Sequence, residues 1–253
     1  MSIFLTGGNG FLGSYVCDRL LEERPDERLA LLVRATSREQ AEAKLWKTWQ
    51  LLMSEDTFRE RMARVDVVFG DLHAKDLGIQ GAARKHLLAN ADSVLHIAAS
   101  LNRKSAKACL NTNLRGTLSV VKLARELAEA GRLRRYSHVS TAATAGERFN
   151  EVVYEDGCID WDRSDYDPYG RTKKFCEHMA RELLPDQSLV FFRPTIVLGD
   201  SRMAPTTQFD MLFAVCTIAD LPVVPLDPGA RVDIVNTDYV GKAIARIHTK
   251  DTV

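Results

Sequence analysis

Short apolar runs alternate along the chain with longer stretches in which apolar residues recur every three or four positions. Short continuous runs predict strands that are buried on both faces of a sheet, and they occupy residues 2–6, 29–33, 65–69, 93–97, 135–140 and 189–193. Helical spacing predicts helices over residues 11–23, 38–64, 80–88, 106–130, 169–184 and 237–248. Strand alternating with helix predicts an α/β fold with a doubly wound parallel sheet.

The alternation becomes irregular after Gly199. Four prolines, at positions 205, 222, 225 and 228, interrupt this part of the chain. Proline lacks a backbone N–H donor and disrupts helices and inner strands. We therefore expect irregular structure between Gly199 and the last helix.

Composition and charge exclude several classes of protein. The chain has 253 residues, a formal net charge of zero and 45% hydrophobic residues, which argues against disorder and against nucleic acid as a partner. No apolar run reaches the roughly 18 residues that a membrane span needs. The cysteines form no C-x-x-C zinc or redox pair, no metal site is expected, and such scattered thiols are typical of a reduced, cytoplasmic protein. They are Cys17, Cys109, Cys158, Cys176 and Cys216.

A glycine-rich turn lies directly between the first predicted strand and the first predicted helix. Gly7, Gly10 and Gly13 form the pattern G-x-x-G-x-x-G, which allows a tight turn, close approach of backbone N–H groups to a pyrophosphate, and close packing of helix on sheet. The helix N-terminus adds a partial positive charge. A turn that serves packing alone is the alternative, but this position favours a dinucleotide site of the Rossmann type. The residues assigned to the cofactor here are Thr6, Gly7, Gly10, Phe11, Leu12 and Gly13.

The residue after the second predicted strand distinguishes NADP from NAD. A ribose 2′-hydroxyl usually meets an acidic side chain about 20 residues after the glycines, whereas a 2′-phosphate favours arginine. Arg34 occupies this position, and neither Asp nor Glu stands at the strand end. Because a guanidinium can bind a phosphate through two hydrogen bonds, we predict NADPH as the cofactor. A solvated arginine at a strand end is the alternative.

A tyrosine and a lysine suggest acid–base chemistry. Tyr169 and Lys173 are four residues apart, after a proline that suits the first turn of a helix. The ammonium is expected to stabilise the phenolate and to lower the tyrosine pKa from its usual value near 10, so that the phenol exchanges a proton with a substrate oxygen. Such pairs are common on solvated helices. Ser140 and Thr141 favour catalysis here, because they stand where a parallel strand ends, at the usual ligand edge.

With these residues, the chain resembles the extended short-chain dehydrogenase/reductase superfamily, in which a Ser/Thr–Tyr–Lys set acts beside a nicotinamide. The resemblance implies that Tyr169 donates a proton to the substrate oxygen. It also implies that Lys173 adjusts the pKa of Tyr169 and holds the nicotinamide ribose. It implies that Thr141 orients the substrate carbonyl, with Ser140 as a neighbour and substitute. It also implies that further residues contact the cofactor. Asp71 and Leu72 would lie at the adenine, and Ala98 and Ala99 beside the diphosphate. Asn113 matches the superfamily in the central helix, and Pro194, Thr195 and Val197 would lie near the carboxamide.

Several stretches resemble the fatty acyl-CoA reductase and carrier-protein thioester reductase branch of this superfamily. They include LLVRA at 31–35, HIAASLN at 96–102 and RPTIVLGDSR at 193–202. A long polar insertion between Arg34 and Asp71, which carries Trp46 and Trp49, is also typical of that branch. The resemblance implies hydride attack from NADPH on the carbonyl of an acyl thioester of CoA or a carrier protein, which gives an aldehyde and a thiol. Whether a second hydride then gives a primary alcohol stays open.

Two other functions also stay open. One is an extended reductase of another branch, such as a sugar-nucleotide epimerase or dehydratase or a hydroxysteroid dehydrogenase. The other is a non-catalytic NADP-sensing protein, against which the complete Thr–Tyr–Lys set argues.

The resemblance implies a division of the chain into two parts. Residues 1–199 would form the NADP-binding domain, and residues 200–253 would form part of a substrate-binding region that continues in a longer parent protein. We expect His96 and His138 to be packed side chains rather than proton relays, and the tryptophan pair to be the apolar face of a helix. Arg132, Arg134 and Arg135 are expected in a solvated loop before a strand, and docking of a phosphate-bearing carrier on these charges is the alternative.

Overall fold

The structure is a computed structural model that describes residues 2–149, 151–155, 159–224, 227, 229 and 231–251. At its centre is a six-stranded sheet with the strand order β3-β2-β1-β4-β5-β6, and every neighbouring pair is parallel. The predicted doubly wound α/β fold is therefore confirmed. The strands are β1 (Ser2–Thr6), β2 (Arg28–Val33), β3 (Val65–Phe69), β4 (Ala91–His96), β5 (Arg135–Val139) and β6 (Leu189–Phe192).

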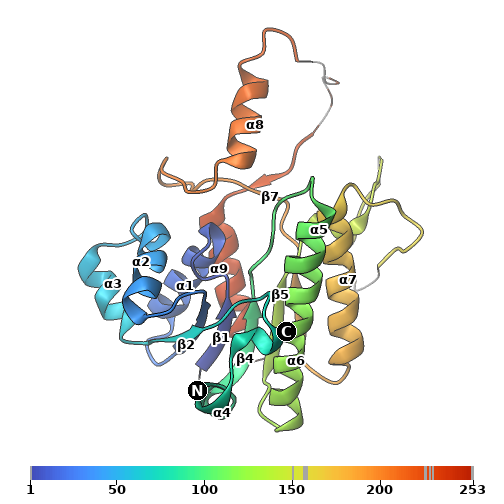
Figure 1. Cartoon of the computed structure of the whole chain (residues 1–253). Helices are drawn as coiled ribbons and strands as arrows, with labels where there is room; N and C mark the ends of the chain where they lie inside the picture. Colours follow the sequence, from blue (N-terminus) through green and yellow to red (C-terminus); the bar gives the residue numbers. More distant parts are fainter. Residues whose placement is uncertain are drawn as a thin grey trace.

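Helices cover both faces of this sheet (Figure 1). On one face lie α1 (Phe11–Glu23), α2 (Arg38–Trp49), α3 (Glu55–Met62) and α9 (Thr237–His248), and on the other lie α4 (Gly81–Asn90), α6 (Gly116–Glu129) and α7 (Pro168–Leu183). Side chains alternate along each strand, so Ile3 and Leu5 of β1 enter the first core whereas Phe4 enters the second. This two-faced burial explains why the strands are continuous apolar runs in the sequence.

The insertion after β2 forms two helices, so the prediction of one helix over residues 38–64 is wrong. After α2 ends at Trp49 the chain turns, and Ser54 begins α3 by accepting a hydrogen bond from the Thr57 amide at 3.3 Å. A serine cap can start a new helix within a stretch whose apolar spacing is helical throughout. The prediction of tryptophans on an apolar helix face is confirmed: Trp49 is fully buried, and both Trp46 and Trp49 contact the ring of Phe58.

The helical stretch predicted over residues 106–130 contains three helical segments of two types in succession. These are α5 (Ala106–Ala108), a π-helical turn labelled η2 (Cys109–Arg115) and α6. Two short 3₁₀ turns, η1 (Lys75–Gly78) and η3 (Ala142–Ala145), lie elsewhere in the chain.

The chain after Gly199 is more ordered than its prolines predict. It contains α8 (Asp210–Ala219), which lies apart from both helical layers (Figure 1), and β8 (Ile234–Val235), which pairs with β7 (Ile196–Val197). Pro205 and Pro222 lie outside regular helices and strands, as predicted. Cys158, Pro225 and Pro228 lie outside the described residues.

Helix α9 is fixed to the sheet by a buried arginine. Arg135, at the start of β5, donates hydrogen bonds from Nη1 to the carbonyl oxygens of Ile247, His248 and Lys250, at 2.9, 2.9 and 2.6 Å. The expectation that Arg135 is solvated is therefore wrong. The last carbonyl groups of a helix lack partners within the helix, and Arg135, which is distant in sequence, donates to those of α9. Val240 and Ile244 place α9 in the same core as α1. The division into residues 1–199 and 200–253 stays a prediction.

Candidate active site

The glycine turn has the close packing that its spacing predicts. Gly7 has φ +84°, which favours glycine, and its carbonyl oxygen accepts a hydrogen bond from the Gly10 amide at 2.9 Å. A Cβ on Gly13 would lie 1.9 Å from that same oxygen, so no larger residue fits there. The Nε1–H of Trp49 donates to the Gly8 carbonyl at 2.9 Å. This contact from the insertion ties the turn to α2, and sequence reasoning missed it.

A cleft of about 750 Å³ opens beside this turn. Seven residues predicted to bind the cofactor line it, and they come from the glycine turn, the end of β2 and the loops after β3 and β4. They are Thr6, Gly7, Arg34, Asp71, Leu72, Ala98 and Ala99. The lining does not include the other predicted positions, which are Gly10, Phe11, Leu12, Gly13, Asn113, Pro194, Thr195 and Val197.

The lining of the cleft is rich in cations. Arg34, Lys44 and Lys47 all line it, and the Lys44 ammonium donates a hydrogen bond to the Arg34 carbonyl oxygen. Arg34 Nη1 lies 3.5 Å from Asp71 Oδ2. The His73 amide, which donates to Asp71, contributes most to lowering the pKa of that carboxyl group, so Asp71 stays ionised. Sequence reasoning found Arg34 and missed both lysines, which helix α2 brings to the cleft.

Asn113 connects the loop after β4 to α7. Its Oδ1 accepts a hydrogen bond from the Ser100 amide at 2.7 Å, and its Nδ2 donates to the Ser100 carbonyl and to Thr172 Oγ1, both at 3.2 Å. All of these contacts are within the protein scaffold. Whether Asn113 also contacts the cofactor stays a prediction.

Tyr169 and Lys173 lie in the first two turns of α7, where Asp167 caps the helix by accepting a hydrogen bond from the Gly170 amide at 2.7 Å. Both side chains are buried. Burial raises the pKa of Tyr169 to about 12, which is opposite to the expected lowering. The Lys173 ammonium donates instead to the Val139 carbonyl at 2.6 Å, and burial lowers the pKa of Lys173 to about 8.

Ser140 and Thr141 follow β5 at the carboxyl edge of the sheet. Thr141 begins η3, and its Oγ1 accepts a hydrogen bond from the Ala143 amide at 3.3 Å. The Ser140 hydroxyl is buried and, within the described ranges, has no hydrogen-bond partner. Helix α7 packs against η3, because a Cβ on Gly170 would lie 3.4 Å from the Ala143 Cβ. The fold thus brings the turn that starts at Thr141 against the start of the Tyr169 helix.

A family model described as "Male sterility protein" matches residues 5–244 of this sequence. The chain belongs to this family. The predicted resemblance to extended short-chain dehydrogenases/reductases of the acyl-CoA and thioester reductase branch is thereby confirmed. Members of this family are NAD(P)-binding proteins of the oxidoreductase class.

The curated relatives of this member of the male sterility family are longer proteins. It is 25% identical to "Fatty acyl-CoA reductase wat" of Drosophila melanogaster over 85% of this chain and 46% of that protein. It is 29% identical to a linear gramicidin synthase of Brevibacillus parabrevis over 96% of this chain and 5% of that one. The solved terminal R domain of the myxalamid PKS-NRPS pathway has a TM-score of 0.85 at 25% identity, over 98% of this chain and 62% of that structure. The chain spans less than half the length of both curated relatives.

In this family member, His96 and His138 are packed side chains, as predicted. Both are fully buried, and their rings lie 5.1 Å apart. His96 contacts Thr6 Oγ1 at 2.6 Å and Thr117 Oγ1 at 3.0 Å. Burial lowers the pKa of both histidines, so they are neutral at physiological pH and connect strands rather than carry charge.

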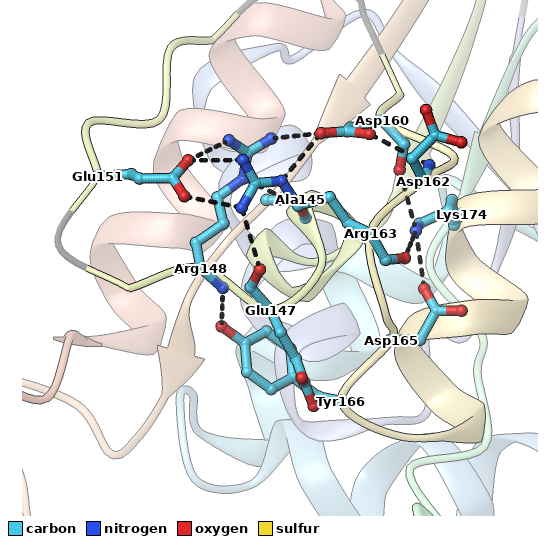
Figure 2. Close-up of polar contacts among 10 residues, drawn as sticks. All are labelled: Ala145, Glu147, Arg148, Glu151, Asp160, Asp162, Arg163, Asp165, Tyr166 and Lys174. Carbon is cyan, nitrogen blue, oxygen red and sulfur yellow. Dashed lines mark hydrogen bonds and ion pairs between the residues drawn. The ribbon is translucent and has the colours of Figure 1, made fainter.

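An ion-pair network holds the segment between η3 and α7 (Figure 2). Arg163 contacts Glu151 at 2.7 Å and Asp160 at 2.9 Å, and Arg148 contacts Glu151 at 3.0 Å. Lys174 of α7 contacts Asp165 at 2.8 Å. Each partly exposed pair contributes little alone, but together they fix the path of the chain into Tyr169. The paired residues lie up to 12 positions apart (163 − 151 = 12), beyond what helical spacing reveals.

Among the described residues, no three His, Cys, Asp or Glu side chains gather as metal ligands would. No helix in those ranges combines the length and apolar character that crossing a membrane requires.

Proposed function

We propose that this chain is an NADPH-dependent reductase of acyl thioesters, with fatty acyl-CoA or an acyl carrier protein as the substrate class. One observation carries the proposal. Thr141 follows strand β5 at the carboxyl edge of the sheet, and the η3 turn that it starts packs against the helix of Tyr169 and Lys173, through Ala143 and Gly170. Proteins named fatty acyl-CoA reductase and a reductase domain of a synthetase are similar over most of this chain.

The glycine turn fits the diphosphate of a dinucleotide. No larger residue fits at Gly13, and α1 begins at Phe11 with backbone N–H groups that have no partners within the helix. Gly7, Ala98 and Ala99 would lie beside the diphosphate, and Asp71 beside the adenine. When NADPH is bound, it supplies a hydride to the substrate carbonyl.

Thr141 and Tyr169 would stabilise and then neutralise the negative charge that develops on the substrate oxygen. As the carbonyl carbon becomes tetrahedral, its oxygen becomes an oxyanion, to which the Thr141 hydroxyl donates a hydrogen bond. Tyr169 transfers its phenolic proton to this oxygen and gives a neutral hemithioacetal. The carbon–sulfur bond then breaks, which releases an aldehyde and a thiol. The Lys173 ammonium, which donates a hydrogen bond to the Val139 carbonyl, would bind the nicotinamide ribose.

The direct test is stoichiometric. With NADPH and a long-chain acyl-CoA, we expect one free thiol for each NADPH consumed when aldehyde is the product, and one for every two when a primary alcohol is formed. Loss of NADPH absorbance and thiol release are measured together. NADPH consumption without thiol, from any acyl-CoA or acyl carrier protein, would favour a reductase of another branch. NADPH binding without any consumption would favour a sensing protein.

Cofactor preference is expected to depend on Arg34. Replacing Arg34 by Ala should raise the KM for NADPH about 10- to 100-fold, since hydrogen bonds to charged groups contribute roughly 1.5–3 kcal/mol. The KM for NADH, which lacks the 2′-phosphate, should change less than threefold and serves as the internal control. Lys44→Ala and Lys47→Ala should each have smaller effects in the same direction. An equal loss for both cofactors would contradict a phosphate site at Arg34.

We further propose that the chain acts in the cytoplasm and alongside a further domain of a longer protein. Free, buried thiols at Cys17, Cys109 and Cys176 suit a reducing compartment. The relatives that carry similar sequences are longer than this chain.

A further inference from the structure

The loop after β4 places a guanidinium over the ring of the proposed proton donor. The guanidinium carbon of Arg103 lies 4.9 Å from the centroid of the Tyr169 ring, a distance at which a cation is attracted to an aromatic face. Arg103 Nη1 also lies 2.5 Å from Asp167 Oδ2. The other oxygen of this carboxylate, Oδ1, accepts the capping hydrogen bond from the Gly170 amide. Asp167 therefore starts α7 and holds Arg103 over the first turn of that helix.

Lys173, the cation that the sequence assigns to Tyr169, is bound elsewhere. Its ammonium donates to the Val139 carbonyl at 2.6 Å and lies 3.4 Å from His138 Nε2. Of the charges that act on the Tyr169 phenol, Arg103 does most to lower its pKa. The other titratable groups that act on it are Asp167, Cys109 and Cys176, and each raises that pKa. Arg103 is thus the main cation that opposes the effect of burial.

We propose that Arg103 is a positioning residue that makes Tyr169 a stronger proton donor, with Asp167 holding the guanidinium over the ring. This inference rests on the proposed function and deepens it. A guanidinium remains charged throughout the working pH range, so it stabilises the phenolate that is left when the Tyr169 proton moves to the substrate oxygen. The phenolate then regains a proton from water, and Arg103 itself exchanges none.

The test is a charge series at position 103. Arg103→Gln should lower kcat at pH 7 roughly three- to tenfold, because a weaker acid donates its proton more slowly. Arg103→Glu should lower it further, and Arg103→Lys should restore most of the loss. The solvent deuterium isotope effect on kcat should grow in the Gln variant, as proton donation becomes more rate-limiting. Arg125→Gln, which removes an exposed guanidinium of α6 that pairs with Glu129, is the matched control.

A merely structural role for Arg103 predicts a different result. It would lower kcat in the Lys and Gln variants alike and would leave the solvent isotope effect unchanged, which would overturn the proposal. Affinity for NADPH is measured by fluorescence in each variant and should stay within about twofold, because Arg103 contacts Tyr169 and Asp167, neither of which is assigned to cofactor binding.

A titration separates this inference from the proposed function. The ultraviolet tyrosinate absorbance of each variant is compared with that of the same variant carrying Tyr169→Phe, so that the difference reports Tyr169 alone. Ionisation should begin at higher pH in Arg103→Gln than in the unaltered chain, and at still higher pH in Arg103→Glu. Superimposed curves would overturn the proposal. If the chain reduces no thioester but the curves keep this order, the proposed function fails while the effect of Arg103 on Tyr169 stands.

Discussion

Replacing Tyr169 by Phe should lower the kcat of thioester reduction by a factor of about 10³, within the range that general acid catalysis contributes. Phenylalanine keeps the aromatic ring under Arg103 and removes only the hydroxyl that donates the proton. Without this donor, the oxyanion left by hydride attack must take its proton from water. Because the change removes only a hydroxyl, from a residue that is not assigned to cofactor binding, the dissociation constant for NADPH should change less than twofold.

A matched control lies three residues earlier. Tyr166 is exposed, and its hydroxyl accepts a hydrogen bond from the Arg148 amide (Figure 2), so Tyr166→Phe removes a similar group outside the proposed chemistry. Its kcat should stay within about threefold of the unaltered chain. Steady-state rates and NADPH fluorescence titrations give both quantities. Unchanged turnover in Tyr169→Phe would remove this residue from the mechanism.

Replacing Glu177 by Ala should lower the free energy of unfolding by about 3 kcal/mol, at the lower end of the cost of breaking a buried ion pair. Glu177, one turn after Lys173, is fully buried, and its carboxylate contacts Arg193 Nε at 3.0 Å and Nη2 at 2.6 Å. The Arg193 side chain is 24% exposed, so water can compensate part of its charge after the change. This pair joins the Tyr169 helix to the residue that precedes Pro194.

Urea denaturation measures this loss, with Glu182→Ala as the control. Glu182 lies on the same helix, is largely exposed and contacts His178 at 3.8 Å, so its removal should cost under about 0.5 kcal/mol. In a double-mutant cycle, Arg193→Ala should cost less when Glu177 is already Ala, because the two side chains interact directly. Equal losses in Glu177→Ala and Glu182→Ala, together with additive losses at positions 177 and 193, would show that the pair does not stabilise the fold.

The local pattern of the chain was sufficient to predict the fold and the glycine turn beside the cleft. A strand buried on both faces leaves a continuous apolar run, and a turn that packs as closely as Gly7 and Gly13 tolerates no side chain, so both features can be read from neighbouring residues. The division of the insertion into α2 and α3 was not predicted. Apolar residues have helical spacing both before and after Ser54, which indicates one helix, but the Ser54 cap starts a second one.

The residue pattern alone predicts the doubly wound order of strands and helices, the glycine turn, Arg34 at the end of β2, and Tyr169 four residues before Lys173. Only the tertiary structure decided which cation acts on the Tyr169 phenol. The spacing assigned that role to Lys173, but burial directs its ammonium to the Val139 carbonyl, and a loop 66 residues earlier (169 − 103 = 66) supplies Arg103. Helical periodicity reports neighbours within one turn, whereas a charge from another loop acts through space and leaves no local pattern.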